Sequence, residues 1–292
     1  MAMAILQNLT KYDRICNMNN TTYNKQPHSE RVKASELSLW LMSRGISSIT
    51  TGEIAALIGV PKNQVSQRLA SPKKRNEIVL LANGLWAPVP PEYLTWGAPP
   101  AIDIIDALMR HLDADYYVGW LTAAALHGAS HHAPQVFQVA ASRAIRTKRI
   151  GRSRIRFYHR NPIHHAAIVQ IQSRSGPVSL SSREMTMLDI ADGITIVGGI
   201  DHAANLIVEL CESATPDMSA LSALSIHYPS SVVRRLGYLL ERYAGISALE
   251  QLKAISDGRE TTVSLLDPQF INAGAIDPYW RLKINREVQP DV

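Results

Sequence analysis

Residues 50–69, TTGEIAALIGVPKNQVSQRL, decide the fold of the N-terminal part of the chain. Thr51 can cap a helix, Gly59 permits the positive φ of a tight turn, and Pro61 suits the first turn of a second helix. Val65 and Leu69 are four residues apart, so they share the buried face of that second helix. The stretch therefore predicts two short helices joined by a turn that contains glycine. The outward positions of the second helix are polar: Lys62, Asn63, Gln64, Ser66, Gln67 and Arg68.

The flanking segments complete a winged helix-turn-helix. Ser29 opens an amphipathic segment that predicts a first helix, which Gly45 can end. A basic run at 73–75 follows the second motif helix, and two β-prone runs then flank Asn83-Gly84, the dipeptide best suited to a type I′ hairpin. The Ser-Pro-Lys-Lys sequence at 71–74 indicates that the second motif helix ends early. We place this domain at residues 29–92.

The polar helix has the side chains that reading DNA requires. Asn63 and either Gln64 or Gln67 carry the paired donor and acceptor that fit an adenine edge in the major groove. Cations at its ends can contact phosphates. The predicted DNA-binding residues are Thr51, Lys62, Asn63, Gln64, Ser66, Gln67, Arg68, Lys73, Lys74, Arg75 and Asn83. The alternative is a winged helix that contacts protein and has a merely solvated polar face.

Charge is segregated along the chain, although the total of +5 decides little. Residues 116–182 contain no Asp or Glu, whereas residues 184–260 contain 11 acidic residues against five basic ones. Alternate arginines in the first segment would form a row of cations on one face of a strand. The predicted second basic surface comprises Arg143, Arg146, Lys148, Arg149, Arg152, Arg154 and Arg156. It could bind nucleic acid, be a solvated sheet face, or dock an acidic protein.

The rest of the chain predicts a larger α+β domain. Residues 1–28 are rich in Asn and Thr and are expected to form a flexible arm, and the prolines of 93–101 indicate a linker. Residues 102–292 should form a mixed α/β domain with a small sheet and a helical subdomain, in which Ser181 and Glu184 form a capping box. The fold class is therefore α+β, with a winged helix and a larger C-terminal domain.

Several function classes lack their usual residues. Cys16 and Cys211 are far apart, and no segment approaches 18 uninterrupted apolar residues, so we expect a cytoplasmic protein without a membrane span. Six histidines fall between 127 and 165, but that stretch contains no carboxylate or cysteine to complete a metal site. No nucleophile elbow or phosphate-binding glycine loop occurs. We therefore expect no catalytic residue, no metal and no cofactor.

Five stretches together resemble the AbiEi family of abortive-infection antitoxins, and most of residues 35–285 lie between the first and the last of them. They are TTGEIAALIGVPKNQVSQRLA, the wing NGLWAPVP, YYVGWLTAAALHGASHHAPQVFQVA, SSREMTMLDIADGITIVGGIDHAANLI and YWRLKIN. The resemblance implies an N-terminal winged helix, with 62–68 as its reading helix and Asn83-Gly84 as its wing tip. It also implies a C-terminal antitoxin domain whose basic strands lie at 143–156. The arm before Ser29 is not part of the family's pattern.

The resemblance implies a regulator that binds inverted repeats in its own promoter, usually cooperatively, and opposes a nucleotidyltransferase-like toxin encoded beside it, often without a stable complex. We expect two protomers on two half-sites of double-stranded DNA. One alternative is an interaction module that neutralises a toxin without specific DNA binding. A less favoured alternative is an enzyme that processes nucleic acid, using the histidines beside the arginine-rich strands.

Overall fold

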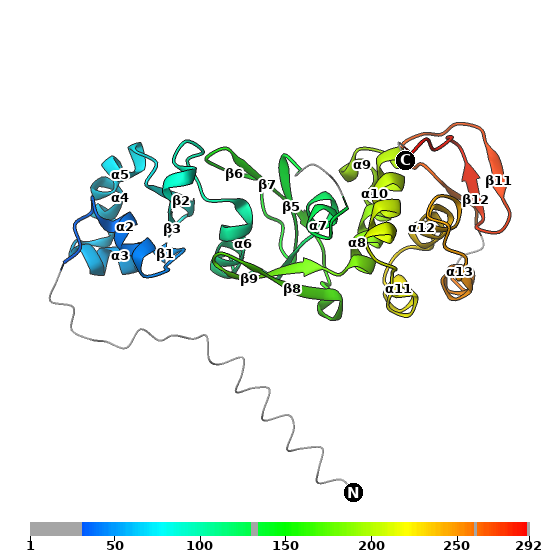
Figure 1. Ribbon diagram of the computed structural model, residues 1–292, viewed down its shortest axis with the longest axis horizontal. Helices are drawn as coiled ribbons and strands as arrows, with labels where there is room; N and C mark the ends of the chain where they lie inside the picture. The colour runs from blue at the N-terminus through cyan, green and yellow to red at the C-terminus, as the bar shows by residue number, and fades with distance from the viewer. Residues whose placement is uncertain (1–30, 130–133, 260–261, 291–292) are drawn as a thin grey trace, which may run out of the picture.

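The computed structural model describes residues 31–129, 134–259 and 262–290. The arm predicted at 1–28 lies outside these residues. Figure 1 shows an elongated molecule with a helical N-terminal unit at one end, a sheet in the middle, and a helical subdomain with a small sheet at the other end. This arrangement confirms the predicted α+β class.

The N-terminal unit has the element order expected of a winged helix. Its helices are α2 (Leu37–Ser43), α3 (Thr51–Ile58), η1 (Lys62–Gln64), α4 (Val65–Arg68) and α5 (Ala70–Lys74). Its strands β1 (Ile49–Thr50), β2 (Ile78–Ala82) and β3 (Leu85–Pro88) form a sheet of order β1-β3-β2. Leu37, Ile54, Val65, Leu69 and Trp86 are buried together in its core. The spacing of Val65 and Leu69 thus has the predicted consequence.

The helix starts differ in detail from those expected. Within the described residues the first helix begins at Leu37, after a turn at 34–36, and Ser29, where we expected this segment to open, lies outside them. The cap of α3 is Thr50 and not Thr51: the Thr50 hydroxyl accepts from the Glu53 amide at 3.3 Å, and the Glu53 carboxylate accepts from the Thr50 amide at 2.8 Å. This capping box uses the residue that also ends β1, so Thr51 becomes the first helical residue.

The central sheet of the described chain has six strands in the order β6-β7-β5-β4-β9-β8. They are β4 (Tyr116–Val118), β5 (Val136–Ala141), β6 (Lys148–Ile150), β7 (Ser153–His159), β8 (Ile168–Ser173) and β9 (Gly176–Ser181). The pairs β5–β7 and β4–β9 are parallel and the other neighbours are antiparallel. One face packs on α6 (Ala101–His111), and the other packs on α7 (Trp120–Leu126) and α8 (Arg183–Asp192).

Helix α6 joins the N-terminal hairpin to the central sheet. Its buried Ile105 and Leu108 belong to one core that also contains Leu85 of β3 and Ile155 of β7. The segment predicted as a linker at 93–101 follows a short helix, η2 (Pro91–Tyr93), and its Ala98 is 2% exposed. The two predicted domains therefore share packed side chains, while their boundaries stay a prediction.

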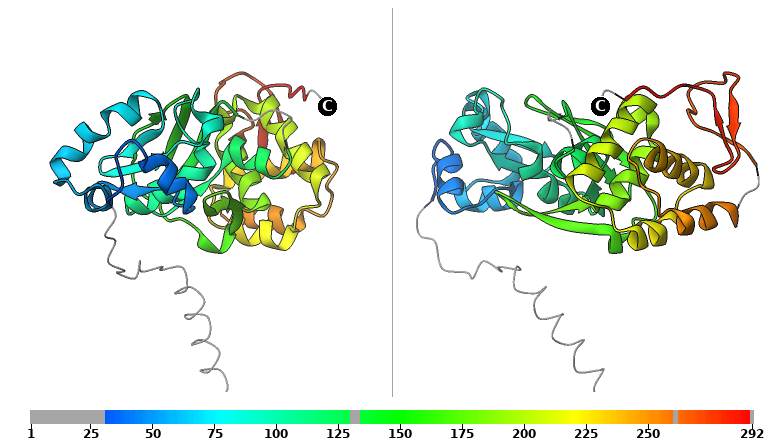
Figure 2. Two further views of the ribbon diagram at one scale, coloured as in Figure 1. Left: turned by 60° about the vertical axis from the view of Figure 1, so that its left-hand side comes forward. Right: turned by 45° about the vertical axis from the view of Figure 1, so that its right-hand side comes forward.

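The C-terminal third contains the helical subdomain and a second small sheet, drawn from yellow to red in Figure 2. Its elements are α9 (Ile194–Val197), α10 (Ile200–Ser213), α11 (Met218–Ser225), α12 (Ser230–Arg242), α13 (Glu250–Asp257), β10 (Ser264–Leu265), β11 (Ala275–Asp277) and β12 (Leu282–Ile284). The cap of α8 is Ser182, one residue after the predicted Ser181, whose hydroxyl instead bonds within the core. No helix in the described residues is both long and apolar enough to cross a membrane.

Candidate nucleic-acid interface

Residues 62–75 form an exposed ridge along the N-terminal unit. Only Val65, Leu69 and Pro72 of this stretch are buried, which is the spacing of a single helical stripe. All the other side chains of the stretch are exposed, including every DNA-binding residue predicted within it. We call residues 62–75 the reading ridge.

The ridge bends at Leu69 and does not end there. Helix α4 stops at Arg68, as the Ser-Pro sequence led us to expect, but α5 starts at Ala70. Pro72 has no amide hydrogen, so it cannot bond to the Arg68 carbonyl one turn earlier. The Lys73 amide still bonds to the Leu69 carbonyl at 2.9 Å, which carries the helical path onward to the basic run.

The ridge is electropositive because no carboxylate falls between Glu53 and Glu77. Among the described residues, no ion pair or hydrogen bond engages the side chains of Lys62, Lys73 or Lys74. Arg75 differs from these lysines. Its guanidinium forms a bidentate pair with Glu77 at 2.6 and 2.8 Å, and this hydrogen bonding lowers the pKa of the Glu77 carboxyl. The predicted cations are therefore not equally available to a phosphate.

The predicted wing tip lies apart from the basic run. The Gly84 carbonyl accepts from the Thr51 amide at 2.8 Å, and the His111 ring of α6 lies 2.9 Å from the Asn83 carbonyl oxygen. Strand β2 separates Asn83 from Arg75 by about 17 Å, at 3.3 Å per residue. Thr51 and Asn83 thus belong together near the start of α3, where the turn packs against α6.

A different hairpin lies beside the basic run. The turn between β6 and β7 packs on residues 96–98: the Arg152 amide bonds to the Trp96 carbonyl at 2.8 Å, and a Cβ on Gly151 would come within 2.3 Å of the same oxygen. On the other side, Asn76 bonds to the Leu94 carbonyl at 3.0 Å. The loop 94–97 therefore links the end of the reading ridge to the β6–β7 hairpin, and both lie along the upper edge in Figure 1.

The β6–β7 hairpin presents the predicted row of cations. Arg154 and Arg156 are exposed and alternate with buried Ile155 and Phe157. Arg149 pairs directly with Arg154 across the two strands. Like charges in that position repel, so an anion between them would relieve the repulsion. We call Arg149, Arg152, Arg154 and Arg156 the arginine hairpin.

Other cations of the arginine-rich segment have different surroundings. Arg143 bonds to the carbonyls of Leu112 and Asp113, where α6 ends. Arg146 is exposed in the loop before β6, and Lys148 is half-buried at the start of that strand. The loop 94–97 thus links the arginine hairpin, which is part of the second predicted surface, to the reading ridge. Arg143 and Asn83 lie outside this combined surface.

The comparisons with known proteins concern mainly the C-terminal part. Residues 117–242, which include the arginine hairpin and α7 to α12, match the AbiEi antitoxin C-terminal domain family. Over these residues the chain is similar to the AbiEi antitoxins. This match confirms the resemblance to the AbiEi antitoxins. The β6–β7 hairpin of the matched segment bonds to the loop 94–97, which in turn bonds to Asn76 just after the reading ridge. No curated protein matches the sequence.

The overall fold also occurs in a solved structure. It is similar to the crystal structure of the RV2827C protein from Mycobacterium tuberculosis, with a TM-score of 0.63 and 16% identity. The alignment covers 87% of this chain and 92% of that one, so the likeness includes most of both folds.

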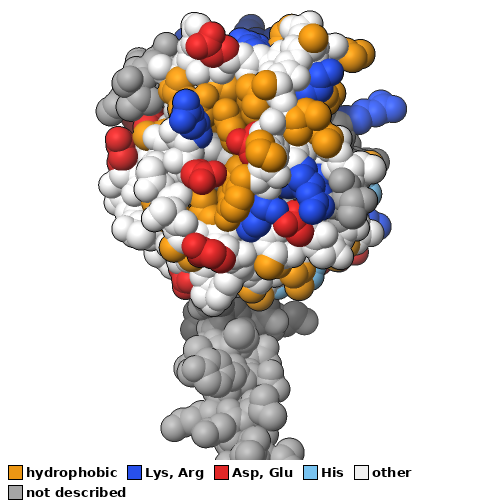
Figure 3. Space-filling model, turned by 90° about the vertical axis from the view of Figure 1, so that its right-hand side faces the viewer, with side chains coloured by type: hydrophobic (Ala, Val, Ile, Leu, Met, Phe, Trp, Pro, Cys, Tyr) orange, Lys and Arg blue, Asp and Glu red, His pale blue; other side chains and the backbone are white. Residues whose placement is uncertain are grey.

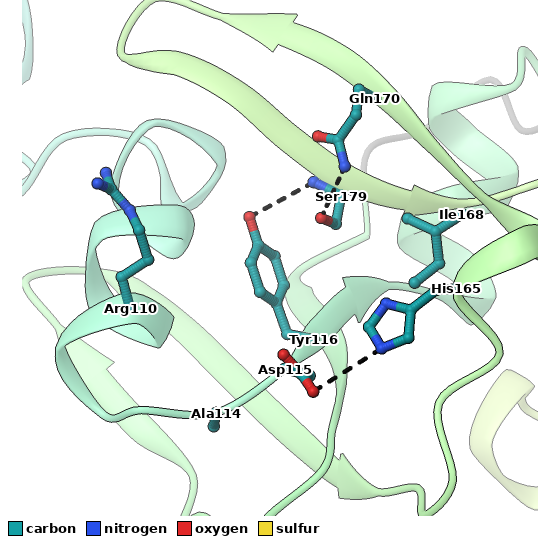
Figure 4. A pocket seen from close by; sticks show the side chains of 8 residues that line it. All are labelled: Arg110, Ala114, Asp115, Tyr116, His165, Ile168, Gln170 and Ser179. Carbon is teal, nitrogen blue, oxygen red and sulfur yellow. Dashed lines mark hydrogen bonds and ion pairs between the residues drawn. The ribbon is translucent and has the colours of Figure 1, made fainter. Parts of the chain in front are cut away.

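A separate hollow of about 290 Å³ lies where α6, β4, β8 and β9 meet, as Figure 4 shows. Tyr116 lines it, and His165 faces Asp115 across it at 3.8 Å. No group of three His, Cys, Asp or Glu side chains suited to a metal occurs in the described residues, and His131 and His132 lie outside them. Its polar groups are already paired, including Arg110 with Asp106, Tyr116 with Ser179 and His165 with Asp115, so we do not include the hollow in the candidate interface.

Proposed function

We propose that this chain is the DNA-binding antitoxin and autorepressor of a toxin–antitoxin operon. One observation carries the DNA-binding part: an exposed ridge without a carboxylate continues into an exposed arginine hairpin. The family match supports the antitoxin part. The proposed activity is binding, and it requires neither catalysis nor a cofactor.

In the proposed complex the reading ridge lies in the major groove. Asn63 and Gln64 or Gln67 can form paired hydrogen bonds with an adenine edge. Lys73 and Lys74 contact phosphates at the end of the ridge. The arginine hairpin extends this contact along the backbone of the same duplex. It makes the phosphate contact that a wing would otherwise make, because the turn at Asn83 is held against α6. Phosphate contacts give the affinity, and the ridge gives the sequence preference.

The proposed operator is a pair of inverted repeats in the protein's own promoter, with one protomer on each half-site. The proposed partner is a nucleotidyltransferase-like toxin encoded beside this gene, opposed without a stable complex. If the chain instead acts only by docking protein, it will form a tight complex with the neighbouring gene's product and will not bind DNA specifically.

The decisive experiment is fluorescence-anisotropy titration of the full chain with its own upstream DNA and with a scrambled duplex, across a salt series. Arg68→Ala tests the ridge, and Arg110→Ala, an exposed arginine near the end of α6, is the matched control. We expect salt-sensitive, preferential binding that only Arg68→Ala weakens. Equal, weak binding to both duplexes would contradict an operator-reading role.

The arginine hairpin has its own test in the same titration. Replacing Arg154 and Arg156 together by Ala should weaken binding to both duplexes and reduce the salt slope by about 0.9 for each phosphate that the hairpin no longer neutralises. An unchanged slope would show that the hairpin does not touch DNA and would restrict the interface to the reading ridge.

A further inference from the structure

The loop 94–97 presents an exposed tryptophan. Trp96 is 52% exposed, which makes it the most exposed aromatic side chain of the described residues. Within the same residues, no hydrogen bond, ring contact or cation–π contact engages its indole. Three of the other four tryptophans are buried, and the Arg44 guanidinium lies 4.1 Å from the ring centre of the fourth, Trp40. The ring and the N–H of Trp96 are thus available to a ligand.

The backbone that carries Trp96 is fixed on three sides. The Trp96 amide bonds to the Tyr93 carbonyl at 2.9 Å, and the Trp96 carbonyl accepts from the Arg152 amide at 2.8 Å. The Leu94 carbonyl accepts from the Asn76 side chain at 3.0 Å. The loop is therefore held by η2, by the arginine hairpin and by the residue that follows the reading ridge. Because this backbone is already ordered, a contact with the indole costs little additional ordering.

The surroundings of Trp96 are cationic. Residues 93–102 contain no charged side chain. The flanking acidic residues, Glu92 and Asp103, both bond to Arg174 on the β8–β9 turn. Exposed cations lie on both sides of the loop instead, at the end of the reading ridge and on the arginine hairpin. Aromatic surface between cations is the combination with which proteins contact the bases and the phosphates of a nucleic acid together.

The other exposed aromatic side chains have a different setting. Phe270 and Tyr279 flank β11 in the C-terminal sheet, at the end of the molecule that faces the viewer in Figure 3. Hydrophobic side chains lie there among both acidic and basic ones. The Arg286 guanidinium lies 5.2 Å from the centre of the Phe270 ring, and the Lys253 ammonium lies 5.1 Å from that of Tyr279. These two rings already have a cation of the chain beside them, whereas Trp96 does not.

We propose that the Trp96 indole inserts into the minor groove of the duplex that the reading ridge and the arginine hairpin contact, an inference that rests on the proposed function. With the ridge in the major groove and the hairpin on the adjoining backbone, the loop between them crosses that backbone. The groove on its other side is the minor groove, which at about 6 Å wide excludes a helix but admits a flat ring on edge. Proteins that bind this groove frequently insert apolar side chains into it.

The chemistry of the indole gives this contact a base preference. The indole N–H is a donor, and the side chain has no acceptor. An A·T pair presents only acceptors in the minor groove, whereas a G·C pair adds the donor amino group of guanine. Trp96 therefore favours A·T pairs at a position that the reading ridge does not contact. It adds a specificity-determining residue to the polar side chains of the ridge.

Inosine substitution tests the groove, because inosine lacks the guanine amino group and keeps the major-groove edge. Anisotropy titration of the full chain compares three duplexes of equal length that contain only A·T, only G·C or only I·C pairs. We expect the A·T and I·C duplexes to bind alike and about fivefold more tightly than the G·C duplex, the effect of one neutral hydrogen bond. Trp96→Ala should remove this preference, and Tyr279→Ala, at a 46% exposed aromatic residue, should keep it. Equal binding of G·C and I·C by the wild type, or a preference that persists in Trp96→Ala, would overturn the proposal.

A salt series on the protein's own upstream DNA separates this contact from the phosphate contacts. Trp96→Ala should weaken binding about tenfold, as expected for a lost aromatic contact with a base, and leave the salt slope unchanged because the indole carries no charge. A reduced slope would show that Trp96 only holds the arginine hairpin in place. Wild-type affinity in Trp96→Ala would show that the indole does not touch DNA. Either result overturns the proposal.

Failure of the proposed function has a different signature. The wild type would then bind its upstream DNA and a scrambled duplex equally weakly, and the minor-groove contact would fail with it. If only the minor-groove contact is wrong, the wild type still prefers its upstream DNA, and G·C and I·C duplexes bind alike. The inosine comparison uses the wild-type chain, so it decides the proposal even if Trp96→Ala does not fold.

Discussion

Arg160, which directly follows β7, reaches the buried carboxylate of Asp189 on α8, with 3.2 Å between Nη2 and Oδ1. Asp189 has no exposed surface, and it accepts hydrogen bonds from the hydroxyls of Tyr117 and Tyr228 at 2.9 Å each. Arg160 also pairs with Asp192 at 2.5 Å. This network ties the arginine-bearing strand and β4 to the helical subdomain.

The first prediction concerns the pH dependence of stability. Burial raises the pKa of Asp189 to about 6, in spite of Arg160 and the two tyrosines, whereas an unfolded Asp has a pKa of about 3.9. Between these values the folded protein holds a proton that the unfolded chain has released. The stabilisation is therefore complete below the unfolded pKa and is lost as the pH rises through 6.

Urea unfolding of the wild type and Asp189→Asn from pH 4 to pH 7.5 measures this effect. The wild type should lose about 2–3 kcal/mol relative to the variant over that range, because each pKa unit corresponds to about 1.4 kcal/mol. Carboxylates that the substitution does not touch, such as Glu77 and Glu92, titrate in both proteins and cancel in the difference. A difference that is constant with pH would mean that Asp189 is ionised throughout.

The second prediction distinguishes the roles of Arg156, on β7, and Arg160, which directly follows β7. Arg160→Gln leaves the buried Asp189 without its cation, so the free energy of unfolding should fall by about 2–4 kcal/mol at pH 7.5. Arg156→Gln changes an exposed arginine whose guanidinium lies 5.2 Å from the centre of the Tyr158 ring, and should alter stability by no more than about 0.5 kcal/mol. DNA affinity should show the opposite order. Comparable stability losses would contradict the division of roles.

The local sequence predicted what depends on short spacing. Alternation at 152–156 indicated outward arginines, Asn83-Gly84 indicated a tight hairpin, and Val65 with Leu69 indicated a buried face, and all three are present. The alternation does not distinguish exposed Arg156 from Arg160, whose environment is decided by carboxylates on α8 about thirty residues later.

What the sequence could not predict depends on contacts between distant segments. A Cβ added to Gly97 would lie 3.5 Å from the Gly151 Cα, and nothing in the local sequence indicates that these two residues are neighbours. The one signal in the sequence is that both residues are glycines, which adopt the positive φ that each has here without steric cost. The Asn83 turn lies against α6 because Leu85 of the hairpin is buried in one core with Ile105 and Leu108 of that helix, a contact that local sequence does not indicate.

The third prediction uses the pair that neutralises Arg75. Glu77→Gln removes the carboxylate, so Arg75 becomes available to a phosphate, and the salt slope of DNA binding should steepen by about 0.9. Glu92→Gln is the matched control, because it releases Arg174 on the β8–β9 turn. This turn lies along the lower edge in Figure 1, whereas α5 and the arginine hairpin lie along the upper edge. Anisotropy titrations at several salt concentrations check both variants. A steeper slope in Glu92→Gln as well would show a general effect of net charge and not a contact by Arg75.

The fourth prediction tests the junction between the reading ridge and the arginine hairpin. Gly151 has φ +57°, and an added Cβ would come within 2.3 Å of the Trp96 carbonyl oxygen, so Gly151→Ala should push the hairpin away from residues 96–98. Gly176→Ala is the control for backbone strain, because Gly176 also has a positive φ but nothing lies within 4 Å of its added Cβ. Both variants should lose about 1–2 kcal/mol of stability from strain, and Gly151→Ala should lose more. In the anisotropy titration, Gly151→Ala alone should approach the affinity of the Arg154→Ala, Arg156→Ala double variant. If Gly151→Ala binds DNA as the wild type does, the hairpin acts independently of its seat on the loop.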